Sequence, residues 1–598
     1  MREYVVPASY TIKDDATLSD NVFEFAEKTP NFVPFQRNAN GAWMDVTAAQ
    51  FAAEVSALAK GLIASGIEYG DRVAIMSGTR YEWVALDFAI WTAGAVTVAI
   101  YETSSADQVE WILKDSGTKM LVFETDQHTA LVAPIVKSLG TVETVLQFDG
   151  ASGAVEQLTE KGKSVTDEVL HARRHQVVVT DPATLVYTSG TTGRPKGAAL
   201  THLNLLSEAA AATQALGSMM VEGKTTLLFL PMAHIFARAI SVAGFAAKLT
   251  IGHTSDIPNL VEHLGKFKPT FVLSVPRVFE KVYNTAKQKA EDGGKGKIFA
   301  AAEATAIEWS EAQDTGGASF LLNLKHTIFD KLVYSKLKAA LGGRCEAAVS
   351  GGGPLGARLG HFYRGVGVTI YEGYGLTETS AAVTVNREGA QRVGSVGQPV
   401  DGSGVRIAED GEVLVQGSVV FNGYWKNDAA TADSIRDGWF HTGDIGRLDE
   451  DGYLFITGRK KEIIVTAAGK NVAPSGLEDT IRAHPLISQA IVVGDAKPFI
   501  AALITLDPEA IPGWLQRNGK AADMPIEQLA VDPDLIAEVD SAVKSANAQV
   551  SKAEAIKKFQ VLHSDFTIES GELTPTLKLK RNVVHETYAD TIEALYTK

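Results

Sequence analysis

The stretch "LVYTSGTTGRPKGAAL", residues 185–200, leads from a short apolar run into two clusters of glycine and hydroxyl residues and then to Lys196. Glycine lets backbone N–H groups converge on one point, and Ser, Thr and Lys side chains add further donors. A surface turn is the usual explanation for any one tripeptide of this kind. The long run of polar and glycine residues that ends in lysine favours a loop that binds an anion, and phosphate is the anion we expect.

The spacing in this stretch excludes the P-loop of the NTPases, because that motif needs Gly-Lys-Ser/Thr followed directly by a helix. Here Lys196 precedes the small apolar segment "GAAL", and a helix is expected only after Thr201, which is a favourable N-cap. The loop is therefore predicted to join two strands.

Length and composition indicate a globular protein of more than one domain. A chain of 598 residues exceeds the size at which a single core stops growing, and 45% hydrophobic with 21% charged residues is ordinary for a soluble protein. The net charge of −15 disfavours nucleic acid as a partner and disfavours broad electrostatic attachment to anionic lipid, although local basic pockets are compatible with it. Peripheral membrane contact and the oligomeric state stay open.

The N-terminus has no apolar signal core, so a cytoplasmic location is expected. The most membrane-like segment, residues 83–101, contains Asp87 and a Thr-Ala-Gly break, and is predicted to be a buried helix followed by a buried strand. The single cysteine, Cys345, has apolar neighbours and is predicted to be a buried thiol without a catalytic role.

The pattern of elements predicts an α/β fold with two domains. Apolar helices alternate with strands between Phe51 and about Val122 and again near Leu273, which indicates layers with mainly parallel strands. Short strands and turns follow from 394 to about 457 and predict a β-rich subdomain, with a hairpin at Asp451-Gly452. The chain then shows a smaller α+β pattern, with a long helix near 536–559.

The charged cluster "GRKKE", residues 458–462, lies where the pattern changes, and a hinge at Lys461 is expected there. The prediction is a large N-terminal domain, 1–460, made of layered α/β subdomains plus the β-rich subdomain, and a small mobile α+β C-terminal domain, 461–598.

Two further strands open into glycines and hydroxyls, "AAVSGGGPLG" from Ala347 and "VTIYEGYGLTETS" from Val368. Ligands in open α/β sheets bind beyond the carboxyl ends of the strands, so these loops are expected to meet over one nucleotide site. Tyr371 or Tyr374 can stack on a base, with glycines nearby that let backbone approach it. Thr377 can donate to a phosphate, and Glu378 can hold Mg²⁺.

Together these motifs resemble those of the adenylate-forming (AMP-binding) superfamily, in the same order and over nearly the whole chain. "YTSGTTGRPKGA" resembles its phosphate-binding loop, and "YEGYGLTETS" its adenine and Mg²⁺ segment. "GWFHTGDIGRLDEDGYLFITGRKKE" resembles its ribose-binding and hinge region, and "LTPTLKLKR" its C-terminal lysine motif. Within the superfamily, "KPTFVLSVPRVFEKVY" and the block ending in "GRKKE" look like bacterial long-chain fatty-acid–CoA ligases.

The resemblance implies ATP, Mg²⁺ and coenzyme A as the reaction's partners beside a fatty acid, and it implies a role for each matching residue. The residues implied to bind the nucleotide and its phosphates are Thr188, Ser189, Gly190, Thr191, Thr192, Gly193, Lys196, Gly351, Gly352, Tyr371, Gly373, Tyr374, Gly375, Asp444 and Arg459. Among these, Asp444 and Arg459 would bind the ribose, and Gly351, Gly352 and Tyr374 would surround adenine. Glu378 and Thr188 are implied at the metal, and Thr377 at the α-phosphate.

An acyl pocket is expected along the His234–Arg238 segment and at Gly353, with His234 as pocket wall and not as a base. His171 and His175 have the i, i+4 spacing of zinc ligands, but no third ligand is evident, and a solvated helix end is the preferred interpretation.

The C-terminal motif contains two lysines, Lys578 and Lys580, and has Leu577 where the superfamily has Gly. The preceding Thr-Pro-Thr and the following Arg581 favour Lys578 as the catalytic lysine. The expected activity is an ATP-dependent long-chain fatty-acid–CoA ligase that acts through an acyl-adenylate. An acyl-AMP ligase that loads a carrier protein and a non-catalytic nucleotide or lipid sensor are the alternatives.

Overall fold

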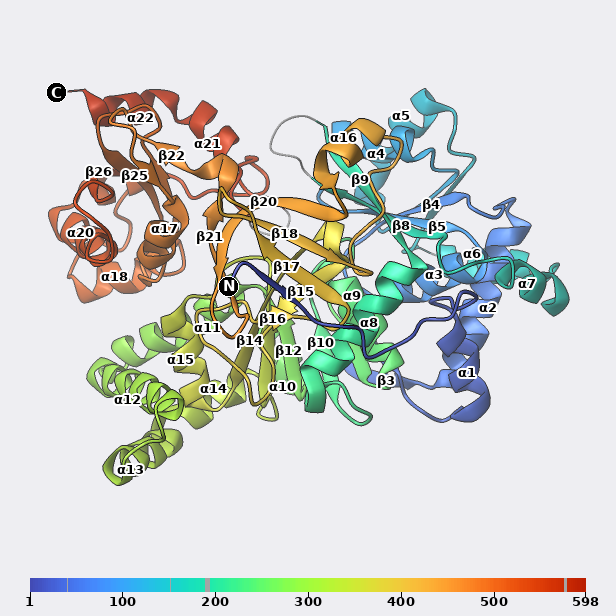
Figure 1. Cartoon of the computed structure of the whole chain (residues 1–598), viewed down its shortest axis with the longest axis horizontal. Coiled ribbons are helices and arrows are strands. Elements are labelled where there is room, and N and C mark those ends of the chain that lie inside the picture. Colours follow the sequence, from blue (N-terminus) through green and yellow to red (C-terminus); the bar gives the residue numbers. More distant parts are fainter. Residues whose placement is uncertain (40, 151, 189–193, 575–577, 598) are drawn as a thin grey trace.

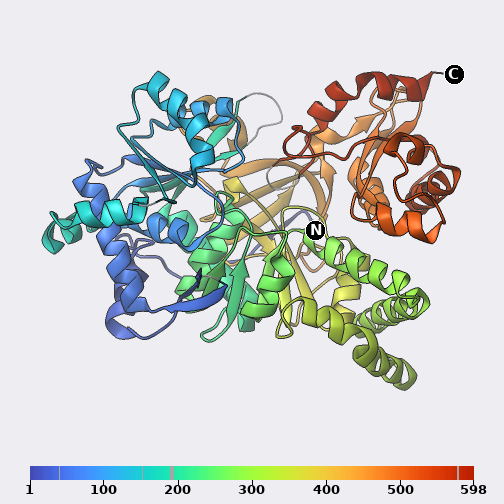
Figure 2. The ribbon, with the colours of Figure 1, turned by 180° about the vertical axis from the view of Figure 1, so that it is seen from behind.

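The computed structural model describes residues 1–39, 41–150, 152–188, 194–574 and 578–597. A large N-terminal domain and a smaller C-terminal domain lie side by side, the smaller one at the upper left of Figure 1 and at the upper right when seen from behind in Figure 2. The predicted α/β fold class with domains of these relative sizes is confirmed.

The first sheet of the N-terminal domain has six strands in the order β7-β6-β4-β5-β8-β9. All its pairs are parallel except β8–β9, so the phosphate-loop motif does join two strands, as predicted. Its strands are β4 (Arg72–Met76), β5 (Val96–Ile100), β6 (Met120–Phe123), β7 (Thr144–Gln147), β8 (Pro182–Thr188) and β9 (Lys196–Thr201). The helices of this part of the chain are α1 (Asp20–Lys28), α2 (Ala48–Ala64), α3 (Tyr81–Thr92), α4 (Ala106–Ser116), α5 (Asp126–Leu139), α6 (Ala154–Gly162) and α7 (Asp167–Arg174).

The second sheet has nine strands in the order β16-β15-β14-β13-β12-β10-β11-β2-β3, with a parallel centre and antiparallel edges. Its strands are β2 (Phe35–Ala39), β3 (Ala42–Val46), β10 (Thr225–Leu228), β11 (Thr250–His253), β12 (Phe271–Ser274), β13 (Ala347–Ser350), β14 (Thr369–Leu376), β15 (Ala381–Val385) and β16 (Gln398–Pro399). Its helices are α8 (His202–Leu216), α9 (Ile235–Ala246), α10 (Leu260–Phe267), α11 (Pro276–Asp292), α12 (Gly296–Asp314), α13 (Phe320–Phe329), α14 (Ser335–Ala340) and α15 (Ala357–Val366), with a π-helical turn at Asp330–Tyr334.

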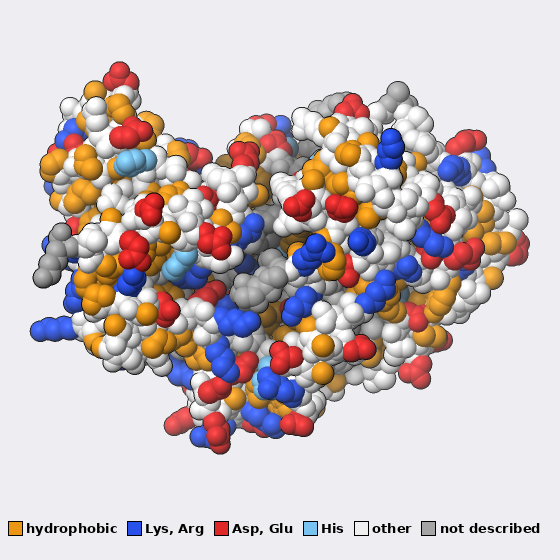
Figure 3. Space-filling view, turned by 90° about the horizontal axis from the view of Figure 1, so that it is seen from above, with side chains coloured by type: hydrophobic (Ala, Val, Ile, Leu, Met, Phe, Trp, Pro, Cys, Tyr) orange, Lys and Arg blue, Asp and Glu red, His pale blue; other side chains and the backbone are white. Residues whose placement is uncertain are grey.

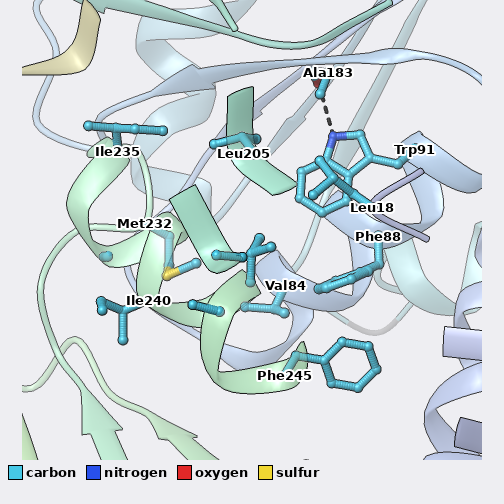
Figure 4. Packing of buried hydrophobic residues seen from close by; sticks show 14 of the residues in the cluster. Leu18, Val84, Phe88, Trp91, Ala183, Leu205, Met232, Ile235, Ile240 and Phe245 are labelled. Atoms are coloured by element: carbon cyan, nitrogen blue, oxygen red, sulfur yellow. Dashed lines mark hydrogen bonds between the residues drawn. The ribbon is translucent and has the colours of Figure 1, made fainter. Parts of the chain in front are cut away.

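The core of this domain lies between the two sheets, where α3, α8 and α9 pack together. Phe88, Trp91 and Phe245 lie in this core, and the indole N–H of Trp91 donates to the Ala183 carbonyl at 2.9 Å (Figure 4). Helix α3 followed by β5 confirms the buried helix and strand expected at 83–101. No helix of the described residues is long and apolar enough to cross a membrane.

The β-rich sheet combines the N-terminal strand with segments more than 390 residues away. Its strands are β1 (Glu3–Val5), β17 (Ser403–Ile407), β18 (Glu412–Gly417), β19 (Ile435–Arg436), β20 (Trp439–Leu448) and β21 (Leu454–Arg459), and α16 (Asp428–Ser434) precedes β19. The turn at Asp451-Gly452 joins antiparallel β20 and β21, which confirms the predicted hairpin. Pairing of β1 with β17 gave no signal in the sequence.

The C-terminal domain is built on a three-stranded sheet with an apolar layer on each face. Alternate residues of β24 and β25 belong to two separate clusters, one with α17 and α20 and the other with α21 and α22. Its elements are β22 (Ile464–Val465), β23 (Asn471–Val472), α17 (Pro474–Arg482), β24 (Ile487–Val493), β25 (Ile500–Leu506), α18 (Ile511–Arg517), α19 (Ile526–Leu529), α20 (Pro533–Asn547), β26 (Ile556–Val561), α21 (Arg581–Thr587) and α22 (Ala589–Tyr596).

The long helix expected at 536–559 is wrong in its second half. Helix α20 ends at Asn547, and Ile556–Val561 instead forms strand β26 beside β25. Burial of Ile556 and Val561 in the domain core, together with the parallel pairing, outweighs the helical propensity of the lysines between them.

Candidate active site

The candidate site lies where strand ends of both N-terminal sheets meet the β-rich sheet and the C-terminal domain. Seen from above, the molecule is hollowed between the two domains, and Lys and Arg side chains gather around the hollow (Figure 3). Of the predicted phosphate loop, Thr188 ends β8 and Lys196 begins β9. Ser189, Gly190, Thr191, Thr192 and Gly193 lie outside the described residues.

Lys196 and Glu378 are brought together by an aromatic residue that the motifs did not single out. The hydroxyl of Tyr424 donates to Oε1 of Glu378 at 2.8 Å, and the Lys196 ammonium lies 4.8 Å from the centre of the Tyr424 ring. Burial and the Glu378 carboxylate raise the pKa of Tyr424, so the phenol stays protonated and donates. The structure thus connects a phosphate-loop cation to the predicted metal ligand.

Glu378 is buried and lies in the 3₁₀ turn Thr377–Thr379, directly after β14. Thr379 fixes this turn, since its hydroxyl accepts from the Leu376 amide at 2.8 Å and donates to the Ala381 carbonyl. No three His, Cys, Asp or Glu side chains cluster as a metal site anywhere in the described part of the chain. One buried carboxylate fits Mg²⁺ that is shared with substrate phosphates, which is how proteins usually hold this ion.

A second charged group gathers around Asp444, which is buried in β20. Its carboxylate accepts from the Tyr374 hydroxyl at 2.6 Å and from Nε of Arg459 at 3.0 Å. Asp444 and Arg459 face each other across the β20–β21 pair, while Tyr374 comes from β14 of another sheet. Burial, with the Asp444 charge, raises the pKa of Tyr374 strongly, so this phenol also donates.

The glycines of β14 let its backbone lie close to β15. A Cβ on Gly375 would lie 1.4 Å from the Ala381 carbonyl oxygen, so the pairing with β15 requires glycine there, whereas one on Gly373 would lie 3.1 Å from the Thr384 carbonyl oxygen, a tight contact. Tyr371 is buried in the same strand.

Gly351, Gly352 and Gly353 form the loop after β13. A Cβ on Gly351 would lie 3.1 Å from the Phe236 ring, and Gly352 has φ +80°, which favours glycine. A Cβ on Gly352 would also lie 3.9 Å from Cε of Lys578. The lysine of the C-terminal domain therefore reaches the glycine loop of the N-terminal domain.

Lys578 is exposed to solvent, although atoms of both domains lie around its ammonium group. Burial lowers its pKa, the Arg459 guanidinium lowers it further, and Asp444, Glu378 and Glu462 act in the opposite direction. Its amide donates to Oγ1 of Thr574, while Lys580 is the N-cap residue of α21. Of the two candidate lysines, Lys578 is the one next to the predicted nucleotide residues.

Helix α11 of the N-terminal domain holds the C-terminal domain in this pose, while Arg581 forms ion pairs within the C-terminal domain. The Arg581 guanidinium pairs with Glu478 and, at 3.3 Å, with Glu462 beside the predicted hinge residue Lys461, which lies in the 3₁₀ turn Lys460–Glu462. Contacts between the domains along α11 include the ion pairs Lys281–Glu509, at 2.7 Å, and Asp292–Arg517, at 2.8 Å.

His234 is the N-cap residue of α9, and its Nδ1 accepts from the Phe236 amide at 3.1 Å. Burial, with the nearby Lys578 charge, lowers the pKa of His234 to about 3, so the ring is neutral near pH 7. The His234 ring therefore lies near Lys578, and its role as a pocket wall stays a prediction.

Arg238 differs from its predicted place on a pocket. It is 1% exposed, and its guanidinium makes two hydrogen bonds of 2.8 and 2.9 Å from Nη2 to Asp87 and one of 2.6 Å to Thr184. Trp83 and Trp91 cover it. A buried charge needs a partner, and here Asp87 of α3 provides it, so Arg238 belongs to the core that positions α9.

Sequence reasoning missed Glu372, which follows Tyr371 in β14. Its Oε1 accepts from the Leu355 amide at 2.9 Å and thereby anchors the end of the glycine loop. Burial raises the pKa of Glu372 to about 7. The sequence did contain a signal for Glu372, because it is an acid within an apolar strand. It contained no signal for the contact of Tyr424 with Glu378, which lies 46 residues away.

This arrangement brings a lysine of the C-terminal domain beside the residues of the N-terminal domain that were predicted to bind a nucleotide. The chain belongs to the AMP-binding enzyme family: residues 22–425 match the family described as AMP-binding enzyme, and 461–598 match the AMP-binding enzyme C-terminal domain.

Named relatives cover the whole chain. It is 58% identical over 599 residues, 100% of both chains, to the long-chain-fatty-acid–CoA ligase FadD15 of Mycobacterium bovis and of Mycobacterium tuberculosis. The long-chain-fatty-acid–CoA ligase ACSBG2 of Xenopus laevis is 30% identical, covering 96% of this chain and 82% of the relative.

Solved structures share the fold at lower identity. The anthranilate CoA ligase AuaEII in complex with anthranoyl-AMP has a TM-score of 0.74 at 19% identity and covers 98% of this chain and 99% of its own. The adenylation domain of a carboxylate reductase from Mycobacterium chelonae has a TM-score of 0.75 at 22% identity. The match covers 98% of this chain and 92% of that domain's chain.

Proposed function

We propose that the protein is an ATP-dependent long-chain fatty-acid–CoA ligase that forms an acyl-adenylate and releases AMP and pyrophosphate. The observation that carries the proposal is the approach of Lys578 to Gly352, beside the Asp444–Arg459–Tyr374 group and Glu378. Relatives that bear this name at 58% identity over the full length support it.

In the first half-reaction the fatty-acid carboxylate attacks the α-phosphorus of ATP, and pyrophosphate leaves. Asp444 accepts the ribose hydroxyls, with Arg459 and Tyr374 fixing its carboxylate. Lys196 and Thr188 hold the β- and γ-phosphates, and Thr377 contacts the α-phosphate. Lys578 lies between carboxylate and phosphate, orients the nucleophile and offsets the charge that develops.

Glu378, with Thr188, would hold the Mg²⁺ that accompanies ATP. The ion supplies neutralisation of phosphate charge as pyrophosphate departs. Tyr424 keeps the Glu378 carboxylate in place through its hydroxyl.

In the second half-reaction the thiol of coenzyme A attacks the acyl carbon, forms the thioester bond and displaces AMP. No protein nucleophile takes part. Burial raises the pKa of the Cys345 thiol to about 12, which accords with a thiol that does not react. The C-terminal domain turns about Lys461 between the two steps, because Lys578 otherwise occupies one side of the acyl carbon.

The fatty-acid tail is proposed to enter an apolar tunnel bordered by His234, at the start of α9, and by Gly351–Gly353. Affinity should rise with chain length by about 0.8 kcal/mol per buried methylene until the tunnel is filled.

A panel of acids of graded length, with ATP and coenzyme A, tests the proposal by following AMP release and thioester formation together. Stoichiometric AMP and thioester, with a rise to long chains and then a plateau, is the expected result. AMP without thioester would indicate an acyl-AMP ligase for a carrier protein, neither product would indicate a sensor, and a flat length profile would exclude a deep tunnel.

A further inference from the structure

Helix α13 and the π-helical turn after it expose a row of large apolar side chains. Phe320 is 81% exposed and Leu321 69%, the two highest values among the large apolar residues that the structure describes. Leu324, Ile328 and Leu332 are 50%, 50% and 52% exposed. Single exposed apolar residues are ordinary, but five along one short helical segment are not.

These side chains share one face of the segment, because 320, 324, 328 and 332 are four residues apart. The other face is already packed: Leu322 is buried, and the Trp309 ring of α12 stacks on His326 at 4.4 Å and donates to Asn323. The apolar row therefore points away from α12. Helix α13 lies at the outer edge of the N-terminal domain in both ribbon views (Figures 1 and 2).

The same segment is basic, although the whole chain has a net charge of −15. Lys325, Lys331 and Lys336 are exposed, and the acid of this segment, Asp330, pairs with Lys338 at 2.8 Å. A projecting helix with an apolar row and neighbouring lysines is the arrangement that inserts into the headgroup region of an anionic membrane.

We propose that α13 and the turn Asp330–Tyr334 form a docking surface for an anionic lipid bilayer. Phe320, Leu321, Leu324, Ile328 and Leu332 enter the boundary between headgroups and acyl chains, while Lys325, Lys331 and Lys336 contact lipid phosphates. A second copy of the chain fits less well, since a two-fold contact through this face would bring the same lysines together. The surface lies outside the active site, so vesicle binding tests it independently of the ligase proposal.

The test is co-sedimentation of the full chain with vesicles of equal parts phosphatidylglycerol and phosphatidylcholine, and with vesicles of phosphatidylcholine alone. We expect binding to the anionic vesicles that weakens with added salt. The variant F320S/L321S/L324S/I328S should bind at least about tenfold less. The matched control M44S/V169S/V261S/V531S removes exposed apolar residues elsewhere and should bind like the parent.

The charge contribution is tested by K325Q/K331Q/K336Q, which should lower binding to anionic vesicles by about fivefold per lysine. The control K137Q/K161Q/K552Q removes exposed lysines of other elements and should leave binding unchanged. Circular dichroism and turnover with soluble substrates, unchanged in all variants, show that they are folded.

The proposal is overturned if the parent protein does not bind anionic vesicles, or if each control loses as much binding as its test variant. It is also overturned if the apolar variant changes only the sedimentation coefficient, from dimer to monomer, because the face would then join two copies.

Discussion

Lys578→Ala should suppress acyl-AMP formation while sparing the transfer of a supplied acyl-adenylate to coenzyme A. The Lys578 chain passes the glycine loop, with Cε 3.9 Å from the Cβ position of Gly352, and its charge is felt by Arg459, Asp444 and Glu378. A preorganised charged donor aimed at the charge that develops stabilises the transition state by about 3–4 kcal/mol. Adenylation should therefore fall by about 10²–10³-fold.

The assay measures pyrophosphate release with acid and ATP alone, and separately thioester formation from added acyl-AMP. Lys580→Ala is the matched control, because Lys580 is two residues away and is the N-cap residue of α21, and it should leave adenylation within about threefold of the parent. The pH profile gives a second readout. Since the pKa of Lys578 is lowered from 10.5, adenylation should decline on the alkaline side below pH 10.5 as the ammonium loses its proton, and thioester formation should not follow it.

The opposite pattern, with Lys580→Ala defective and Lys578→Ala active, would show that the register of the motif is wrong by two residues. Equal loss of both steps in Lys578→Ala would indicate a structural role. Full adenylation in both variants would remove this lysine motif from the mechanism.

Three further predictions concern the metal, the buried acid and the hinge. Glu378→Ala should abolish turnover at ordinary Mg²⁺ and recover partly at raised Mg²⁺, measured as AMP release against metal concentration. Glu208 is buried in α8, where it accepts from the Ala382 amide at 3.0 Å, and burial raises its pKa from 4.5 to about 8. The native state therefore holds an extra proton between those pH values and loses stability as pH rises, by up to about 1.4 kcal/mol per pH unit, so Glu208→Gln should flatten the pH dependence of unfolding. Lys461→Pro, which fixes φ in the turn Lys460–Glu462, should slow thioester formation more than adenylation, followed in the two separate assays.

Each of these has a distinct contrary result. Wild-type rates in Glu378→Ala would remove Glu378 from the metal role. An unchanged slope between pH 5 and 8 in urea unfolding of Glu208→Gln would mean that Glu208 is ionised in the native state. Equal loss of both half-reactions in Lys461→Pro would point to misfolding and not to an arrested rotation.

The sequence by itself determined the order of several strands, helices and turns along the chain, because these elements depend on local sequence patterns. The strand–loop–strand at 185–200, the N-cap Thr201, the helix and strand at 83–101 and the hairpin at Asp451-Gly452 all follow from periodicity, capping and turn chemistry, and the structure contains each of them. The four motifs likewise determined the family.

Only the tertiary structure decided which side chains meet. Tyr424 joins Lys196 to Glu378, and β1 pairs with a strand some 400 residues away, because sheet pairing and packing act between segments without local signals. Arg238 fits the pocket segment by position, yet Asp87 holds it in the core, since a charge buried there must be paired. The helix expected at 536–559 became partly a strand for the same reason: the edge of β25 and the apolar core beside it stabilise Ile556–Val561 more than local helix propensity does.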